Sequence, residues 1–150
     1  MAHDEKSSPD FRAGREVHRL SKRIHRHMEA NRSHHKLTDV SVTNMHIIRY
    51  LYDHQEQDIF QKDLEAAFGT TRSTASKVLQ LMEQKGLILR LPVKQDARLK
   101  KLVLTERSLE LHRRMRENAD EMEVTLLKGF TPTEINLLAS YLERMQRNLD

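Results

Sequence analysis

The chain of 150 residues contains no cysteine and no tryptophan, and only four glycines and three prolines. Without cysteine it has no disulfide framework, no thiolate metal site and no thiol-based redox switch. Aromatic residues make up only 5% of the chain, whereas charged residues make up 32%. This composition is typical of a helical protein with long solvated faces rather than of a β-sandwich.

Long hydrophobic runs are absent as well. The first ten residues, MAHDEKSSPD, lack the apolar segment of a signal peptide and are expected to form a flexible tail. No run approaches the roughly 18 to 20 apolar residues that span a bilayer. We therefore expect a soluble, cytoplasmic protein with no membrane partner.

Catalytic and metal-binding motifs are also missing. There is no Gly-rich phosphate loop, no G-x-S-x-G and no H-E-x-x-H, so we expect neither an enzyme nor a cofactor. Nine histidines remain, and His25 with nearby acids offers a nitrogen/oxygen metal site as an alternative. Because no helical pair comes with a third ligand, we expect no metal.

Apolar residues recur at helical spacing at both ends of the chain, from Val17 to Met28 and from Ile135 to Leu149. Isolated helices of this length are marginal in water, so these stripes need partners. We expect residues 11–40 and 106–150 to form a helical dimerisation region, and packing within one subunit is the alternative. The residues expected in the homodimer interface are Val17, Leu20, Ile135, Leu138, Leu142 and Met145.

The centre of the chain predicts a helix-turn-helix followed by a β-hairpin wing. A helix is expected over 60–68 and ends at Gly69, and a second runs from Thr70 or Thr71 to Lys85. Two alternating strands then flank a polar loop that contains Pro92, Lys94, Gln95 and Asp96. The predicted fold is mainly α with a small β-hairpin: a six-helix winged helix-turn-helix whose DNA-binding domain spans 41–105.

The second helix of this motif has an apolar face, from Ala75 to Met82, expected to pack on Leu64 and Phe68. Its other face and first turn carry short donors, one amide and two cations, with no acid before Glu83. Such side chains suit insertion into the major groove of DNA, although an ordinary solvated helix carries similar ones. The predicted major-groove residues are Thr71, Arg72, Ser73, Thr74, Ser76, Lys77 and Gln80.

The hairpin makes DNA the expected partner. Residues 69–105 contain eight Lys or Arg and two acids, although the whole chain is only +4. Arginine is drawn to the negative potential of an A·T-rich minor groove, and an ion pair from Asp96 is expected to orient Arg98. The predicted minor-groove and phosphate contacts of the wing are Lys94, Asp96, Arg98, Lys100 and Lys101.

Residues 59–105 resemble the winged-helix domain of the MarR family of bacterial transcription regulators. The likeness rests on QKDLEAAFG, on STASKVLQLMEQKGLILR and on the wing signature DARLKKLVLT. It implies a homodimer that represses transcription from pseudo-palindromic operators on double-stranded DNA. It also implies release by a small aromatic or anionic effector, whose site the sequence leaves unknown. A winged helix used for protein contacts, or a histidine-based metal-responsive regulator, is the alternative.

Overall fold

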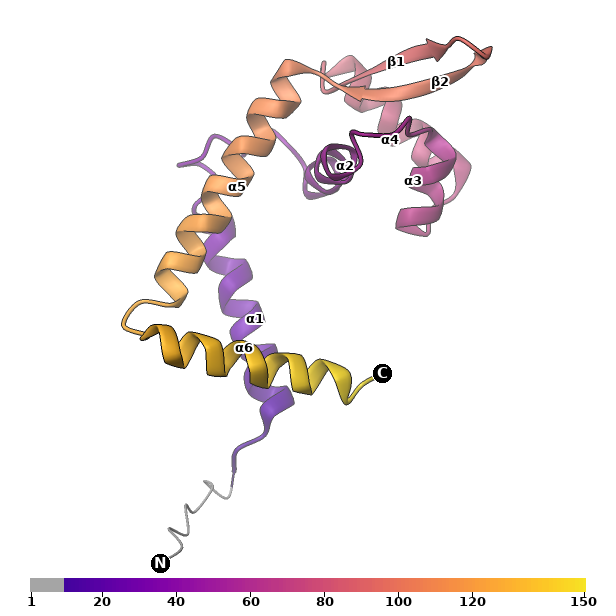
Figure 1. Ribbon diagram of the computed structural model, residues 1–150. Coiled ribbons are helices and arrows are strands. Elements are labelled where there is room, and N and C mark those ends of the chain that lie inside the picture. The colour runs from indigo at the N-terminus through magenta and orange to yellow at the C-terminus, as the bar shows by residue number, and fades with distance from the viewer. Residues whose placement is uncertain (1–9) are drawn as a thin grey trace, which may run out of the picture. The chain divides into compact units, whose positions relative to one another are not determined.

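The computed structural model describes residues 10–150, which hold six helices and a two-stranded antiparallel hairpin (Figure 1). The predicted fold is therefore confirmed. All but the last residue of the predicted tail at 1–10 lie outside the described residues. The elements are α1 (Ala13–Ala30), α2 (Val42–Asp53), α3 (Gln61–Phe68), α4 (Arg72–Gln84), β1 (Ile88–Val93), β2 (Asp96–Leu104), α5 (Glu106–Leu126) and α6 (Pro132–Arg147).

The chain divides into two compact units. One spans residues 30–118 and contains α2, α3, α4, the hairpin and the first part of α5. The other consists of the described residues up to Glu29 together with 119–150. The first unit thus extends beyond the predicted domain 41–105 at both ends. The reason is burial, because Leu37, Val40 and Leu111 belong to the same apolar core as α2 and α4.

The core of the unit 30–118 is built from helix faces, both strands and the segments that connect them. Ile48, Leu79, Met82 and Ile88 have no exposed surface, so α4 buries the apolar face that its periodicity predicts. Leu64 of α3 is buried as expected. Phe68 is not: its side chain is 41% exposed, and its ring meets that of Tyr50 edge-on at 5.7 Å.

Side-chain caps fix where the helices begin. Thr71 caps α4 by accepting a hydrogen bond from the backbone N–H of Thr74, at 3.2 Å. At α6, Thr131 accepts from the N–H of Glu134, whose carboxylate in turn accepts from the N–H of Thr131. These two bonds form a capping box. Ser41 caps α2 by accepting a hydrogen bond from the backbone N–H of Asn44 at 3.1 Å.

The hairpin is longer and its loop shorter than predicted. Only Lys94 and Gln95 form the turn, and β2 begins at Asp96 instead of after a polar loop. The register explains the difference: Val93 lies opposite Asp96, whereas Pro92 lies opposite Lys100. Residues 97–99 of β2 therefore have no partner on β1 and form a bulge. A bulge of this size breaks the alternation by which a strand is recognised in a sequence.

The end of α4 is fastened to the start of α5. Three successive backbone carbonyls after α4, from residues 85 to 87, accept hydrogen bonds from side chains at residues 105 to 108. Arg107 donates to the carbonyl of Lys85 at 2.7 Å, Thr105 to that of Gly86 at 2.7 Å, and Ser108 to that of Leu87. Arg107 also pairs with Asp39 at 3.1 Å. The bond to the C-cap Lys85 satisfies a carbonyl that a helix end leaves without an intrahelical partner, and the other two fix the segment that follows.

None of the helices in the described part of the chain is both long and apolar enough to cross a membrane.

Candidate nucleic-acid interface

One face of α4 is covered with polar side chains that reach solvent. All seven predicted major-groove residues are exposed, whereas Ala75, Leu79 and Met82 on the opposite side are buried. The helix thus buries one apolar face and exposes the predicted polar one, although Leu81 is also exposed. The exposed residues are Thr71, Arg72, Ser73, Thr74, Ser76, Lys77 and Gln80.

The first turn of α4 is held from two directions. The hydroxyl of Thr71 accepts from the N–H of Thr74 and also donates to the Thr74 hydroxyl at 3.0 Å. From α3, the side-chain amide of Gln61 donates to the backbone carbonyl of Arg72 at 3.2 Å. These bonds occupy Thr71 within the helix cap. Among the described residues, no acid pairs with the Arg72 guanidinium or the Lys77 ammonium.

Asp96 shapes the wing by a different bond from the predicted one. Its carboxylate accepts a hydrogen bond from the backbone N–H of Arg98 at 2.9 Å, and in the described chain no ion pair joins the two side chains. A short polar side chain that bonds the backbone two residues later makes a local turn. Asp96 therefore fixes the backbone at the bulge, and the exposed Arg98 guanidinium keeps its charge unpaired within residues 10–150.

Two of the cations counted in this region are already paired. The ammonium of Lys101 lies 2.8 Å from the Asp58 carboxylate, and the guanidinium of Arg90 lies 3.4 Å from that of Glu83. Both pairs link residues that are distant in sequence or lie on different elements. In the described chain, the unpaired cations of this region are therefore Arg72, Lys77, Lys85, Lys94, Arg98 and Lys100.

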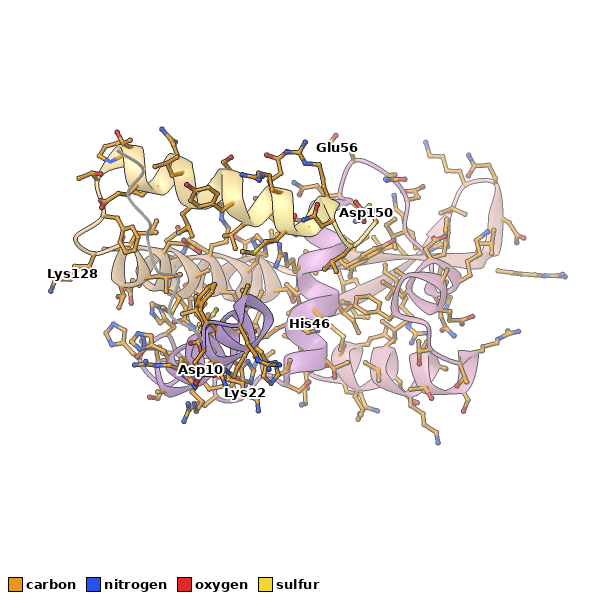
Figure 2. The ribbon with its side chains drawn as sticks, turned by 90° about the horizontal axis from the view of Figure 1, so that it is seen from below. Asp10, Lys22, His46, Glu56, Lys128 and Asp150 are labelled. Atoms are coloured by element: carbon orange, nitrogen blue, oxygen red, sulfur yellow. The ribbon has the colours of Figure 1, made fainter. Side chains whose placement is uncertain are left out.

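A groove of about 390 Å³ lies between α3, the first turn of α4 and the hairpin. Phe60, Leu99 and Leu102 supply apolar lining, and five basic residues and one acid, Glu65, supply charge. Gln61 and Lys62 also line this groove, although neither is among the residues predicted from the sequence to contact DNA. No local signal marks this role, since the Arg72 carbonyl that the Gln61 amide binds is 11 positions away. Nitrogen-tipped side chains project from this part of the molecule (Figure 2).

Two histidines of the unit 30–118 stack on tyrosines of α2. The ring of His112, from α5, lies 3.8 Å from that of Tyr52, and the ring of His54 lies 4.2 Å from that of Tyr50. His112 is buried, and this burial lowers its pKa below the ordinary value. The carboxylate of Asp53 opposes that shift, whereas Arg116 and Arg49 add to it. His46, labelled in Figure 2, is exposed on α2.

The lowered pKa of His112 predicts a loss of stability in mild acid. The unfolded chain takes up a proton at this residue near pH 6.5, whereas the folded chain does so only at lower pH. The free energy of unfolding should therefore fall as the pH drops below about 6.5, until the folded pKa is passed. We expect His112→Phe, which keeps a ring on Tyr52, to reduce this fall in urea titrations at several pH values.

The matched control is His46→Gln, which replaces an exposed histidine of the same unit. It should leave the pH dependence of the unfolding free energy close to that of the parent chain. An unchanged pH dependence in His112→Phe would contradict the assignment.

Comparison with known proteins agrees with this geometry. The MarR family model matches residues 38–99, which include α2, α3, α4 and most of the hairpin. The chain is 25% identical over 112 residues to the uncharacterized HTH-type transcriptional regulator YybA of Bacillus subtilis (strain 168), and this covers 75% of each protein.

Solved structures extend the likeness over nearly the whole chain. A glycine-to-lysine mutant of MepR from S. aureus is 27% identical, with a TM-score of 0.82 over 93% of this chain and 100% of that one. A phenylalanine-to-leucine mutant of MepR, bound to an oligodeoxyribonucleotide, is also 27% identical, with a TM-score of 0.72 over 94% and 100%. Residues 38–99 thus match the MarR family, and the fold of nearly the whole chain is similar to that of the winged helix-turn-helix regulator MepR.

Proposed function

We propose that the protein binds a pseudo-palindromic operator as a homodimer, with α4 in the major groove and the wing in the adjacent minor groove. One observation carries this proposal: the exposed donors of α4 and the unpaired Arg98 belong to one compact unit of the described chain. Base edges in the major groove are read by such donors, and arginine suits a narrow minor groove. The MepR mutant bound to an oligodeoxyribonucleotide has the same fold.

The dimer is supported by apolar surface at both ends of the chain. Neither α1 nor α6, as the structure describes them, buries a single residue in the chain alone. Val17 and Leu20 are each 47% exposed, and Leu138, Leu142 and Met145 are 36–40% exposed. A second copy of the chain that covers these stripes would remove them from water. It would also supply a second α4 and wing for the other half-site of the operator.

Binding is tested with the full-length chain and a duplex that the protein itself selects from a random library. Fluorescence anisotropy across salt concentrations should show affinity that falls steeply with salt, because each neutralised phosphate releases counterions. The selected sequence should be an inverted repeat, and sedimentation equilibrium should give twice the chain mass. If no duplex binds even at low salt, the proposed function is wrong, and a protein partner becomes the interpretation of the winged helix.

The direction of regulation is proposed to be repression, in the cytoplasm where the operator lies. A reporter gene placed behind the selected duplex should be expressed less strongly when the protein is present. Increased expression would make the protein an activator.

A small aromatic or anionic ligand is proposed to release the dimer from DNA. A ligand that binds the native protein raises its melting temperature by mass action. A thermal-shift screen with phenolic acids, followed by anisotropy with the hits, tests this point. Divalent metals belong in the same screen, because stabilisation by metal would favour the histidine-based alternative.

A further inference from the structure

We propose that the groove between α3, α4 and the hairpin holds one sugar-phosphate strand of the bound DNA, and that Lys62 of α3 is one of its phosphate contacts. This proposal rests on the proposed DNA binding and deepens it. It adds a third element, the first helix of the motif, to the two that read the bases.

A major groove and the neighbouring minor groove are separated by one sugar-phosphate backbone. A protein that places α4 in one groove and the wing in the other must therefore accept that backbone between them. The groove of about 390 Å³ has the start of α4 on one side and residues 98–100 of the bulged strand on another, with the start of α3 completing it.

The charge of the groove suits a polyanion. Five basic residues line the groove, and they come from α3, α4 and both strands. Arg90 is paired with Glu83. The other four form no ion pair within the described part of the chain, and each is exposed: Lys62, Arg72, Arg98 and Lys100. An unpaired cluster of cations repels itself, and a polyanion that runs through it removes that cost.

Gln61 joins α3 to the start of α4 across the groove. Its amide donates both to the carbonyl of Arg72, at 3.2 Å, and to the carboxylate of Glu65, at 2.9 Å. The first bond holds the start of α4 against the start of α3. The second engages the single acid of the groove lining, which would otherwise be free to swing toward a phosphate. Gln61 is thus a positioning residue for Lys62 and Arg72.

The occupant is DNA rather than a small anion because of the way the charges are spread. The groove is open, and its four exposed cations come from α3, α4 and β2 instead of converging on one buried point. A free phosphate or carboxylate is held best where several donors converge and water is excluded. An open row of flexible lysines and arginines instead matches a chain of phosphates.

Two variants test the proposal in opposite directions. Lys62→Gln should weaken binding about equally for the selected duplex and for an unrelated one, and should reduce the slope of log affinity against log salt by about one. Glu65→Gln keeps an oxygen that can accept from Gln61 but removes the negative charge. It should bind both duplexes more tightly than the parent, a gain that mere damage to the fold would not produce.

The matched control is Lys128→Gln, which removes an exposed lysine beyond the end of α5 and should leave the slope unchanged. A parent that binds no duplex refutes the proposed function itself. A parent that binds, with Lys62→Gln and Glu65→Gln both indistinguishable from the control, overturns only the groove assignment. The same holds if inorganic phosphate binds the parent in a way that Lys62→Gln abolishes while DNA binding is kept, since the groove is then a small-anion site.

Discussion

Replacing Arg98 by alanine should weaken binding of the selected duplex by about 1–3 kcal/mol, or about 5- to 150-fold. The guanidinium is exposed on the bulge of β2 and has no acidic partner among the described residues. Its removal therefore takes away a free cation and a planar group suited to a narrow minor groove. The measurement is fluorescence anisotropy at fixed salt.

Arg98→Lys is the informative companion. It keeps the positive charge but loses the planar fork of donors, so a merely electrostatic role would be rescued by it. We expect partial rescue on an unrelated duplex and little rescue on an A·T-rich selected site. Full rescue on both would mean that Arg98 only contacts phosphate.

The folded state should be untouched by either change, because the side chain is solvated and Asp96 bonds the backbone rather than the guanidinium. Equal melting temperatures for the parent and both variants would establish that the loss lies in binding. A variant that unfolds early would instead place Arg98 among the supports of the hairpin.

Leu79→Ala should have the largest effect on stability, lowering the free energy of unfolding by about 2–5 kcal/mol. Leu79 is fully buried in the core of the unit 30–118, where it lies among α2, α3 and β1 residues. Truncation removes apolar surface from the core and leaves a cavity that close-packed neighbours fill only in part. Urea unfolding at a fixed protein concentration gives the value.

Leu81→Ala is the matched control on the same helix. Its side chain is 55% exposed, so the same chemical change should alter the unfolding free energy by no more than about 0.5 kcal/mol. Similar losses of unfolding free energy in both variants would show that the buried face of α4 does not hold the helix in the core. Because Leu79 lies opposite the exposed donors, the folded fraction of Leu79→Ala should still bind DNA.

Local features of the helices could be predicted from the sequence, because the residues that cause them are neighbours. The capping box of Thr131 and Glu134, the cap at Thr71 and the separation of buried Leu79 from exposed Lys77 all depend on spacings within one or two turns. The same holds for Gly69 and Gly86, whose positive φ angles end α3 and α4.

The errors arise where distant residues decide the outcome. The bulge at 97–99 depends on the pairing of β2 with β1. As a result, Asp96 and Arg98 belong to a strand, whereas the sequence predicts a polar loop there. Phe68 has core spacing but meets Tyr50 near the surface. Lys101 is paired with Asp58, 43 positions earlier, so its charge is less available than its place in the basic run suggests.

Gln61 and Lys62 illustrate the same limit at the candidate interface. A glutamine and a lysine at the start of a short helix have no distinguishing pattern. Only the folded chain shows that the Gln61 amide reaches Arg72, 11 positions away, and that Lys62 lines the same groove as Arg98.

The three carbonyls that Thr105, Arg107 and Ser108 bind also determine how this protein can be recombined with its relatives. If only residues 88–104 were exchanged, the carbonyls of residues 85–87 and the donors at 105–108 would all come from the recipient. The hydrogen bonds between them would therefore be retained. A cut between α4 and residue 87, or within 105–108, would separate donors from acceptors that were matched to each other. Chimaeras that exchange wing specificity should therefore be joined inside the strands and not at the ends of the helices.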